Sequence, residues 1–172
     1  MKIFLRILHF LILIICLVLQ ISFIEHLKLY NINMDLLMVA VVAISIFDGP
    51  IFGIIYGFIA GMLLDLIVGS ITGINALVYV LNGFFAGKII ELGFRRKLTT
   101  YVLLIFFITE INLLITSGIY NLFNFYTSIR EIGIEMIVNP ALNILFMFII
   151  FPLLSAGREK KEEFGFLYKD KI

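Results

Sequence analysis

Two carboxylic acids inside apolar stretches are the residues best placed to do chemistry. Asp65 lies near the end of the apolar run 50–68, and Glu110 lies close to the midpoint of the run 99–121. A carboxylate inside a membrane-spanning helix costs about 2.5–3.5 kcal/mol on insertion scales, so it normally faces protein or water. No lysine or arginine lies deep in any apolar run. We expect Glu110 to be neutral and hydrogen-bonded within the chain; contact with a partner subunit and a proton or cation relay are the alternatives.

Asp65 also continues a ladder of glycines. A step of four residues turns a helix by about 400°, so successive members are only about 40° apart and form a slowly drifting stripe. Such a stripe lets another helix approach closely, either from the same chain or from a second protein. Asp65 itself either caps or hydrogen-bonds the next helix, near Thr72 and Asn75, or forms a polar recognition site. The ladder comprises Gly49, Gly53, Gly57, Gly61, Asp65 and Gly69.

Further polar residues follow one face of the next helix. Asn75, Tyr79, Asn82 and Ala86 fall within a narrow arc of the run 73–90. A polar face within lipid must be buried against protein or a cavity. Together with Gly53, Gly57, Gly61, Asp65 and Glu110, the residues Asn75, Tyr79 and Asn82 are therefore the candidates for binding a partner or lining a pocket. Later runs add Ser117, Asn121 and Asn124 on the stripe of Glu110, and Glu135, Asn139 and Asn143.

Motifs for catalysis or metal binding are absent from the sequence. There is no HExxH, GxSxG or Walker loop, and nothing pairs a nucleophile with a base. The two histidines, His9 and His26, lie far apart in sequence, and the single Cys16 permits no disulfide framework or CxxC zinc site. We expect a protein that is not an enzyme and that holds no metal or cofactor.

The elements that carry these residues are predicted to be membrane helices. The chain is 62% hydrophobic and 15% charged, with a mean hydropathy of +1.14, whereas soluble domains are about 25% charged. A bilayer-spanning helix needs about 20 apolar residues. The sequence predicts an all-α, polytopic integral membrane protein with a helical domain over 1–156 and a juxtamembrane tail over 157–172. Its apolar runs are 7–24, 36–47, 50–68, 73–90, 99–121 and 132–154.

The run 36–47 is short for a span, and only Asp48-Gly49-Pro50 separates it from the next. These two runs form either two tightly linked spans or a re-entrant hairpin plus a span. Charge placement favours six crossings, because eleven of the 13 lysines and arginines then lie on the side of the N-terminus, and only Lys28 and Arg130 lie on the other. Both termini are then cytoplasmic. The basic tail is either a solvated end or an interfacial helix.

Five segments between residues 34 and 88 form a distinctive pattern of glycines, acids and a tyrosine: MDLLMV over 34–39, then FDGPIFG over 47–53, GFIAGMLLDL over 57–66, GINALVY over 73–79 and NGFFAG over 82–87. This pattern resembles the MreD family of rod-shape-determining membrane proteins. In that family a span opens with Pro-Asp-Leu, a glycine ladder ends in Gly-x-x-x-Asp, and a span with small residues and a tyrosine follows. Met34 replaces the usual proline and leaves Asp35 as the acid of the first helical turn.

The resemblance implies a non-catalytic scaffold in the bacterial cytoplasmic membrane. Such a protein works with the bitopic protein MreC and helps to couple cytoplasmic MreB filaments to the peptidoglycan synthases RodA and its partner transpeptidase, which maintains rod shape. The family is also similar in layout to the substrate-binding subunits of energy-coupling-factor vitamin transporters.

Two other functions compete with the scaffold. A transporter subunit needs a polar outer pocket, which Asp65, Asn75, Tyr79 and Asn121 could line, but the alanine-based docking motif of such subunits is missing from the run Ile7 to Ile24. A membrane-embedded enzyme acting on lipids needs clustered acids or histidines at metal-ligand spacing, and the sequence has none. The scaffold is therefore the favoured interpretation.

Overall fold

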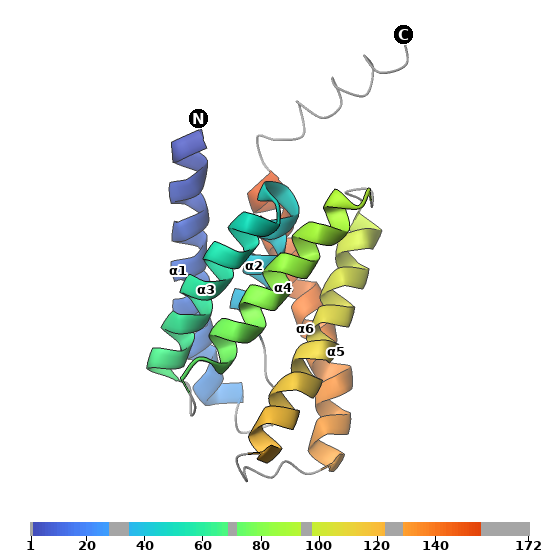
Figure 1. The fold of residues 1–172 in the computed structure, drawn as a ribbon. Coiled ribbons are helices and arrows are strands. Elements are labelled where there is room, and N and C mark those ends of the chain that lie inside the picture. Colours follow the sequence, from blue (N-terminus) through green and yellow to red (C-terminus); the bar gives the residue numbers. More distant parts are fainter. Residues whose placement is uncertain (1, 28–34, 69–71, 94–97, 123–128, 156–172) are drawn as a thin grey trace.

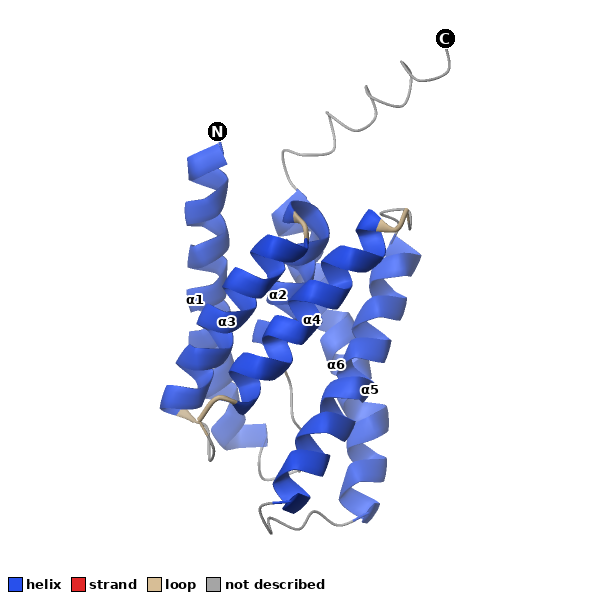
Figure 2. Ribbon diagram, in the orientation of Figure 1, coloured by secondary structure: helices blue, strands red, loops and turns tan. Residues whose placement is uncertain are grey.

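The computed structural model describes residues 2–27, 35–68, 72–93, 98–122 and 129–155, and within these ranges every regular element is an α-helix (Figures 1 and 2). Each of the six predicted apolar runs forms one helix, with bounds close to those expected. The helices are α1 (Lys2–Leu27), α2 (Leu36–Asp48), α3 (Pro50–Ile67), α4 (Ile74–Glu91), α5 (Leu98–Leu122) and α6 (Ile129–Ser155).

Local signals explain where the central helices start and stop. The Asp35 side chain accepts a hydrogen bond from the Met38 amide at 3.1 Å and so caps the start of α2. Gly49 has φ = 96°, a value that side chains disfavour, and it ends α2 directly before Pro50. Pro50 occupies the first turn of α3, where its missing N–H leaves no hydrogen bond unmade.

Helix α2 forms the centre of the molecule. Every residue from Leu36 to Ile46 is at most 4% exposed, and α2 packs against α1, α3, α4 and α6. Its 13 residues span only about 20 Å at 1.5 Å per residue, less than the ~30 Å hydrocarbon core of a bilayer. Figure 1 shows the consequence: α2 starts partway along the bundle, well above the lower ends of α5 and α6.

The arrangement fits a polytopic membrane protein. Four helical segments of the described chain are long and apolar enough to cross a bilayer, and two shorter apolar ones, Arg6–Ser22 and Leu36–Asp48, accompany them. Helix α1 begins and α6 ends at the same end of the bundle (Figure 1), as an even number of crossings requires. The four long segments are Pro50–Ile67, Ile74–Glu91, Thr99–Ile119 and Ile132–Leu154.

Several predictions from the sequence concern residues outside the described ranges. These include the outer loops at Lys28 and Thr127, Met34 of the family segment, the basic loop at 95–97 and the tail from 157 to 172. They remain predictions.

Candidate functional site

The glycine ladder of α3 lies against α4. A Cβ atom added at Gly53, Gly57 or Gly61 would come within 3.0 Å of the α4 backbone, at Gly83, Tyr79 and Ala76 respectively. The close approach is mutual, since a Cβ on Gly83 would meet the backbone of Gly53 in the same way. This contact is the most extensive between any two helices. The face of α3 on which these glycines lie is thus occupied by the same chain.

Asp65 caps the start of α4 from the end of α3. Its carboxylate accepts hydrogen bonds from the backbone amides of Gly73 at 2.9 Å, Asn75 at 3.2 Å and Ala76 at 3.0 Å, and from the Asn75 side-chain amide at 2.8 Å. The first amides of a helix have no partner within the helix and attract negative charge. Asp65 is 3% exposed, and its hydrogen bonds agree with the capping role considered from the sequence.

A second carboxylic acid, the half-buried Asp35, lies where α2 begins. Besides capping α2, it accepts a hydrogen bond from the Tyr79 hydroxyl of α4 and a longer one, at 3.4 Å, from the Gln20 side chain of α1. Gln20 also accepts from the backbone amide of Leu37 at 2.9 Å. Three helices therefore meet through polar side chains at the start of the central helix.

Helices α5 and α6 join the same network. The Asn143 side chain of α6 accepts from the Asp35 backbone amide at 3.0 Å and donates to the Thr109 hydroxyl of α5 at 3.1 Å. Thr109 in turn donates to the carbonyl of Ile105, one turn earlier, at 2.7 Å. These contacts connect α1, α2, α4, α5 and α6. We call the linked residues the Asp35 network; they are Gln20, Asp35, Tyr79, Thr109 and Asn143.

Sequence reasoning did not find Gln20 or Thr109. Both are single polar residues in apolar helices, with no motif around them. The available signal was weaker: a buried glutamine or threonine in a membrane helix needs a partner, and the nearby acid at Asp35 was a candidate. Asn82, which the sequence singled out, lies close to this region of α4 but its amide nitrogen has no hydrogen-bond partner among the described residues.

A further polar contact lies at the end of the bundle where α1 begins. His9 of α1 is 2.9 Å from Asp48 at the end of α2, measured from Nδ1 to Oδ2. The His9 ring also packs edge-on against Tyr56 of α3. Nearby, the Arg6 guanidinium lies over the Phe52 ring, 5.1 Å from its centroid. These contacts attach α1 to the α2–α3 turn.

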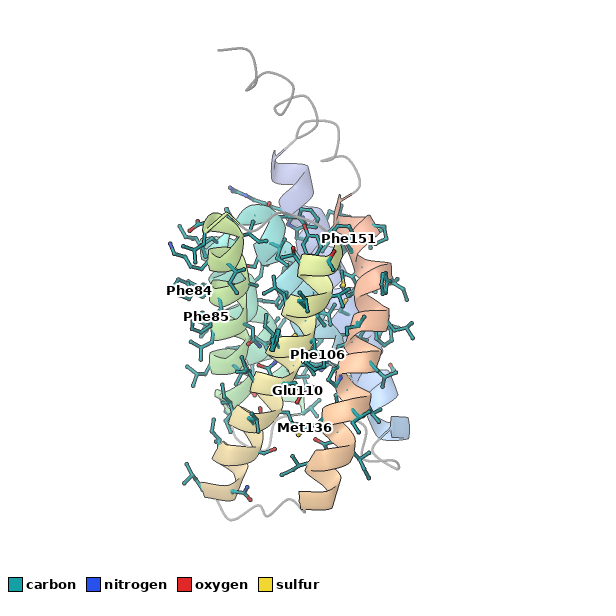
Figure 3. All side chains as sticks on the ribbon, turned by 90° about the vertical axis from the view of Figure 1, so that its right-hand side faces the viewer. Phe84, Phe85, Phe106, Glu110, Met136 and Phe151 are labelled. Carbon is teal, nitrogen blue, oxygen red and sulfur yellow. The ribbon has the colours of Figure 1, made fainter. Side chains whose placement is uncertain are left out.

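Glu110 behaves differently from Asp35 and Asp65. Both its carboxyl oxygens are shielded from solvent, yet neither has a hydrogen-bond partner in the part of the chain that the structure describes. The expected bonds to Asn, Thr or backbone groups are therefore not found there. In Figure 3, Glu110 lies at the seam between α5 and α6, between the levels of Phe106 and Met136. Asn112, one turn from Thr109 and 9% exposed, also has both side-chain polar atoms unpaired within the described ranges.

The acids Asp35 and Asp65 serve the described helices as hydrogen-bond acceptors. Within the described ranges, no three His, Cys, Asp or Glu side chains gather as metal ligands would. Both Asp65 oxygens accept hydrogen bonds from the start of α4, and Asp35 Oδ1 accepts from the start of α2 and from Tyr79, so both acids are engaged within the fold. The fold and its polar residues define a polytopic helical membrane protein whose buried polar groups mainly bond its own helices together.

Comparison with known families identifies this class more closely. The family model for rod shape-determining protein MreD matches residues 1–156. The chain belongs to the MreD family, in agreement with the resemblance of residues 34–88, and its role is in determining cell shape. No curated protein and no solved structure matches the chain significantly.

Proposed function

We propose that this protein is a non-catalytic membrane scaffold of the cell-elongation machinery. It would bind an MreC-like bitopic protein and, through it, help to couple MreB filaments to the RodA synthase and its partner transpeptidase. One observation supports this proposal most directly: Asp35, which is half-buried, and Asp65, which is buried, are engaged by hydrogen bonds from helix starts and neighbouring side chains. Groups engaged in this way stabilise a rigid bundle rather than a reacting substrate.

A rigid bundle suits a scaffold. Helices α3 and α4 touch backbone to backbone, so they have little freedom to slide, and the Asp35 network fixes α1, α5 and α6 around α2. A partner helix that docks on such a surface meets side chains already in place, which reduces the entropy lost on binding.

Loss of the protein tests the function. Depletion should turn elongated cells round while uptake of every vitamin assayed in parallel continues. The alternative from the sequence, a substrate-binding subunit of an energy-coupling-factor transporter, predicts the reverse. Cells that stay rod-shaped while uptake of one vitamin collapses would overturn the scaffold in favour of the transporter subunit.

The proposed topology places both termini in the cytoplasm, in the bacterial inner membrane. Leu92, just after α4, then lies on the cytoplasmic side, and Leu122, at the end of α5, lies outside; both are exposed. With Cys16 replaced by serine, Leu122→Cys should react with a membrane-impermeant thiol reagent in intact cells, and Leu92→Cys only after permeabilisation. Reaction of Leu92→Cys in intact cells would contradict this orientation.

A further inference from the structure

Glu110 stands out because its position and its lack of partners do not fit together. It lies twelve residues from each end of α5 (Leu98–Leu122), and therefore near mid-bilayer, where unpaired polar groups are most unfavourable. Both carboxyl oxygens are shielded, and no donor in the described residues reaches them. Asp35 and Asp65, by contrast, are each hydrogen-bonded several times. A membrane acid that the described residues leave unpaired is a candidate to bond a donor from another molecule.

The surface around Glu110 is apolar and faces outward. Phe106, Phe107 and Leu114 on α5 and Met136 and Ile137 on α6 are all exposed, and Figure 3 shows Phe106, Glu110 and Met136 in turn along the seam of the two helices. Lipid could cover such a surface but could not supply a hydrogen bond at that depth. The seam therefore offers an apolar surface with a single polar group at its centre, which we call the Glu110 seam.

We propose that the Glu110 seam docks a membrane helix of a partner protein. The Glu110 side chain, whose carboxyl oxygens are shielded in the chain alone, turns outward in the complex. The partner helix carries a hydrogen-bond donor at mid-bilayer, an amide, hydroxyl or ammonium group, that pairs with the Glu110 carboxyl. The partner segment is a helix because only a helix satisfies its own backbone within lipid as a single span. This inference rests on the proposed scaffold function and assigns its docking surface.

A second copy of this chain is a poorer occupant. Two copies in one membrane share the same orientation, so a two-fold axis along the membrane normal brings residues of equal depth together. Glu110 would then face Glu110, a pair that repels when both carboxyls are ionised and bonds only when they share a proton. The nearest donor on the same stripe, Ser117, lies about 10 Å away along the axis at 1.5 Å per residue. Charge complementarity thus favours a different helix, with a donor where this chain has an acceptor.

Site-specific photo-crosslinking in cells tests the docking. A benzoylphenylalanine at Leu114, one turn from Glu110, should form an adduct with a partner, and mass spectrometry should place the crosslink in a membrane helix within a turn of a donor side chain. The matched control is Phe58, a similarly exposed residue on α3, which should form no such adduct. An adduct of equal yield at Phe58, an adduct with a second copy of this chain, or a partner helix without a donor would each overturn the proposal.

Two substitutions then test the role of the carboxyl. Glu110→Gln keeps an acceptor and should leave the adduct unchanged within about twofold, whereas Glu110→Leu should reduce it by about tenfold, the effect of one hydrogen bond of about 1.4 kcal/mol. The purified Glu110→Leu protein should nevertheless unfold in detergent at the same temperature as the native protein or higher, because it loses an unpaired polar group. An unchanged adduct, or a lower unfolding temperature of the purified Leu variant, would refute the pairing.

Failure of this inference can be distinguished from failure of the proposed function. If depletion rounds the cells but Glu110→Leu leaves both the adduct and cell shape unchanged, the scaffold stands and the Glu110 seam is not its docking surface. If depleted cells stay rod-shaped, the scaffold itself is wrong.

Discussion

The two helical hairpins α3–α4 and α5–α6 differ in how they use their glycines and carboxylic acids. In α3–α4, a glycine on one helix meets the backbone of the other at Gly53, Gly57, Gly61 and Gly83. In α5–α6, Gly118 and Gly133 face open space, with no atom within 4 Å of the position a Cβ would take. Glycine thus sets the separation of the first pair of helices and has no such role in the second.

Carboxylates show the same contrast. Asp65 of α3 is engaged in four hydrogen bonds to the start of α4, whereas Glu110 of α5 has none among the described residues. Since lipid cannot replace water as a hydrogen-bond partner, a group that the fold leaves unpaired stays available to another molecule. The contrast indicates that the contact between α3 and α4 is closed by its own residues, whereas α5–α6 keeps one acid unpaired among the described residues, at the seam proposed above for docking.

The largest expected effect comes from closing the glycine contact. Gly57→Leu would place a branched side chain against the backbone of Tyr79 and Val80, and backbone cannot move aside as a side-chain end can. We expect a loss of at least ~3 kcal/mol, the upper end of overpacking penalties, and little folded protein by size-exclusion chromatography in mild detergent. Gly118→Leu is the matched control and should elute as the native protein does. Equal folded yields of both variants would contradict the claim that glycine sets the helix separation in α3–α4 but not in α5–α6.

A smaller effect is expected from removing the cap of α4. Asp65→Ala would leave the amides of Gly73, Asn75 and Ala76 without their acceptor, and we expect about 2 kcal/mol of destabilisation, as for the stronger helix caps. Asp65→Asn should recover part of this loss, since the amide oxygen still accepts. Glu91→Ala, which breaks only the exposed pair with Lys88, should change stability by less than ~1 kcal/mol. Thermal unfolding in detergent distinguishes the two sites; equal shifts would contradict the capping role.

The sequence predicts the α3–α4 hairpin better than the rest, for a physical reason. Hydropathy together with Asp48-Gly49-Pro50 placed its helices at 50–68 and 73–90, against the observed Pro50–Ile67 and Ile74–Glu91. The partners of Asp65 lie only eight to eleven residues away in sequence. When a residue bonds across a short turn, its partners can be predicted from their separation in sequence. Capping was therefore already one of the two roles expected for Asp65.

The Asp35 network could not be predicted in this way. Asn143 lies 108 residues from Asp35 and Tyr79 lies 44 residues from it, so their pairing depends on how all the helices pack. The central place of α2 was missed for a related reason. Hydropathy reports that 36–47 is apolar, but it does not distinguish a helix enclosed by other helices from one facing lipid. The lack of a hydrogen-bond partner at Glu110 was likewise invisible, because it depends on which side chains fail to reach it.

The smallest effect, and the one that tests the comparison most closely, concerns two buried asparagines of α5–α6. Asn143 bonds both Asp35 and Thr109, so Asn143→Leu should destabilise the protein by about 1 kcal/mol, the lower end of the cost of leaving buried groups unsatisfied. Its matched control is Asn112, which is also buried but has no hydrogen-bond partner for either side-chain atom in the described chain.

Asn112→Leu should be neutral or stabilise the protein by up to ~1 kcal/mol, because an apolar group of similar size replaces an amide that makes no bond. The opposite signs of the two shifts in unfolding temperature would show that burial alone does not make a polar residue structural in this hairpin. If Asn112→Leu instead lowers the unfolding temperature as far as Asn143→Leu does, Asn112 has a hydrogen-bond partner within the folded chain. The inner polar groups of α5–α6 would then be paired within the chain, as Asp65 is in α3–α4. If Asn112→Leu is neutral and also leaves cell shape unchanged, the binding capacity of α5–α6 lies on its outward seam at Glu110 rather than on its inner face.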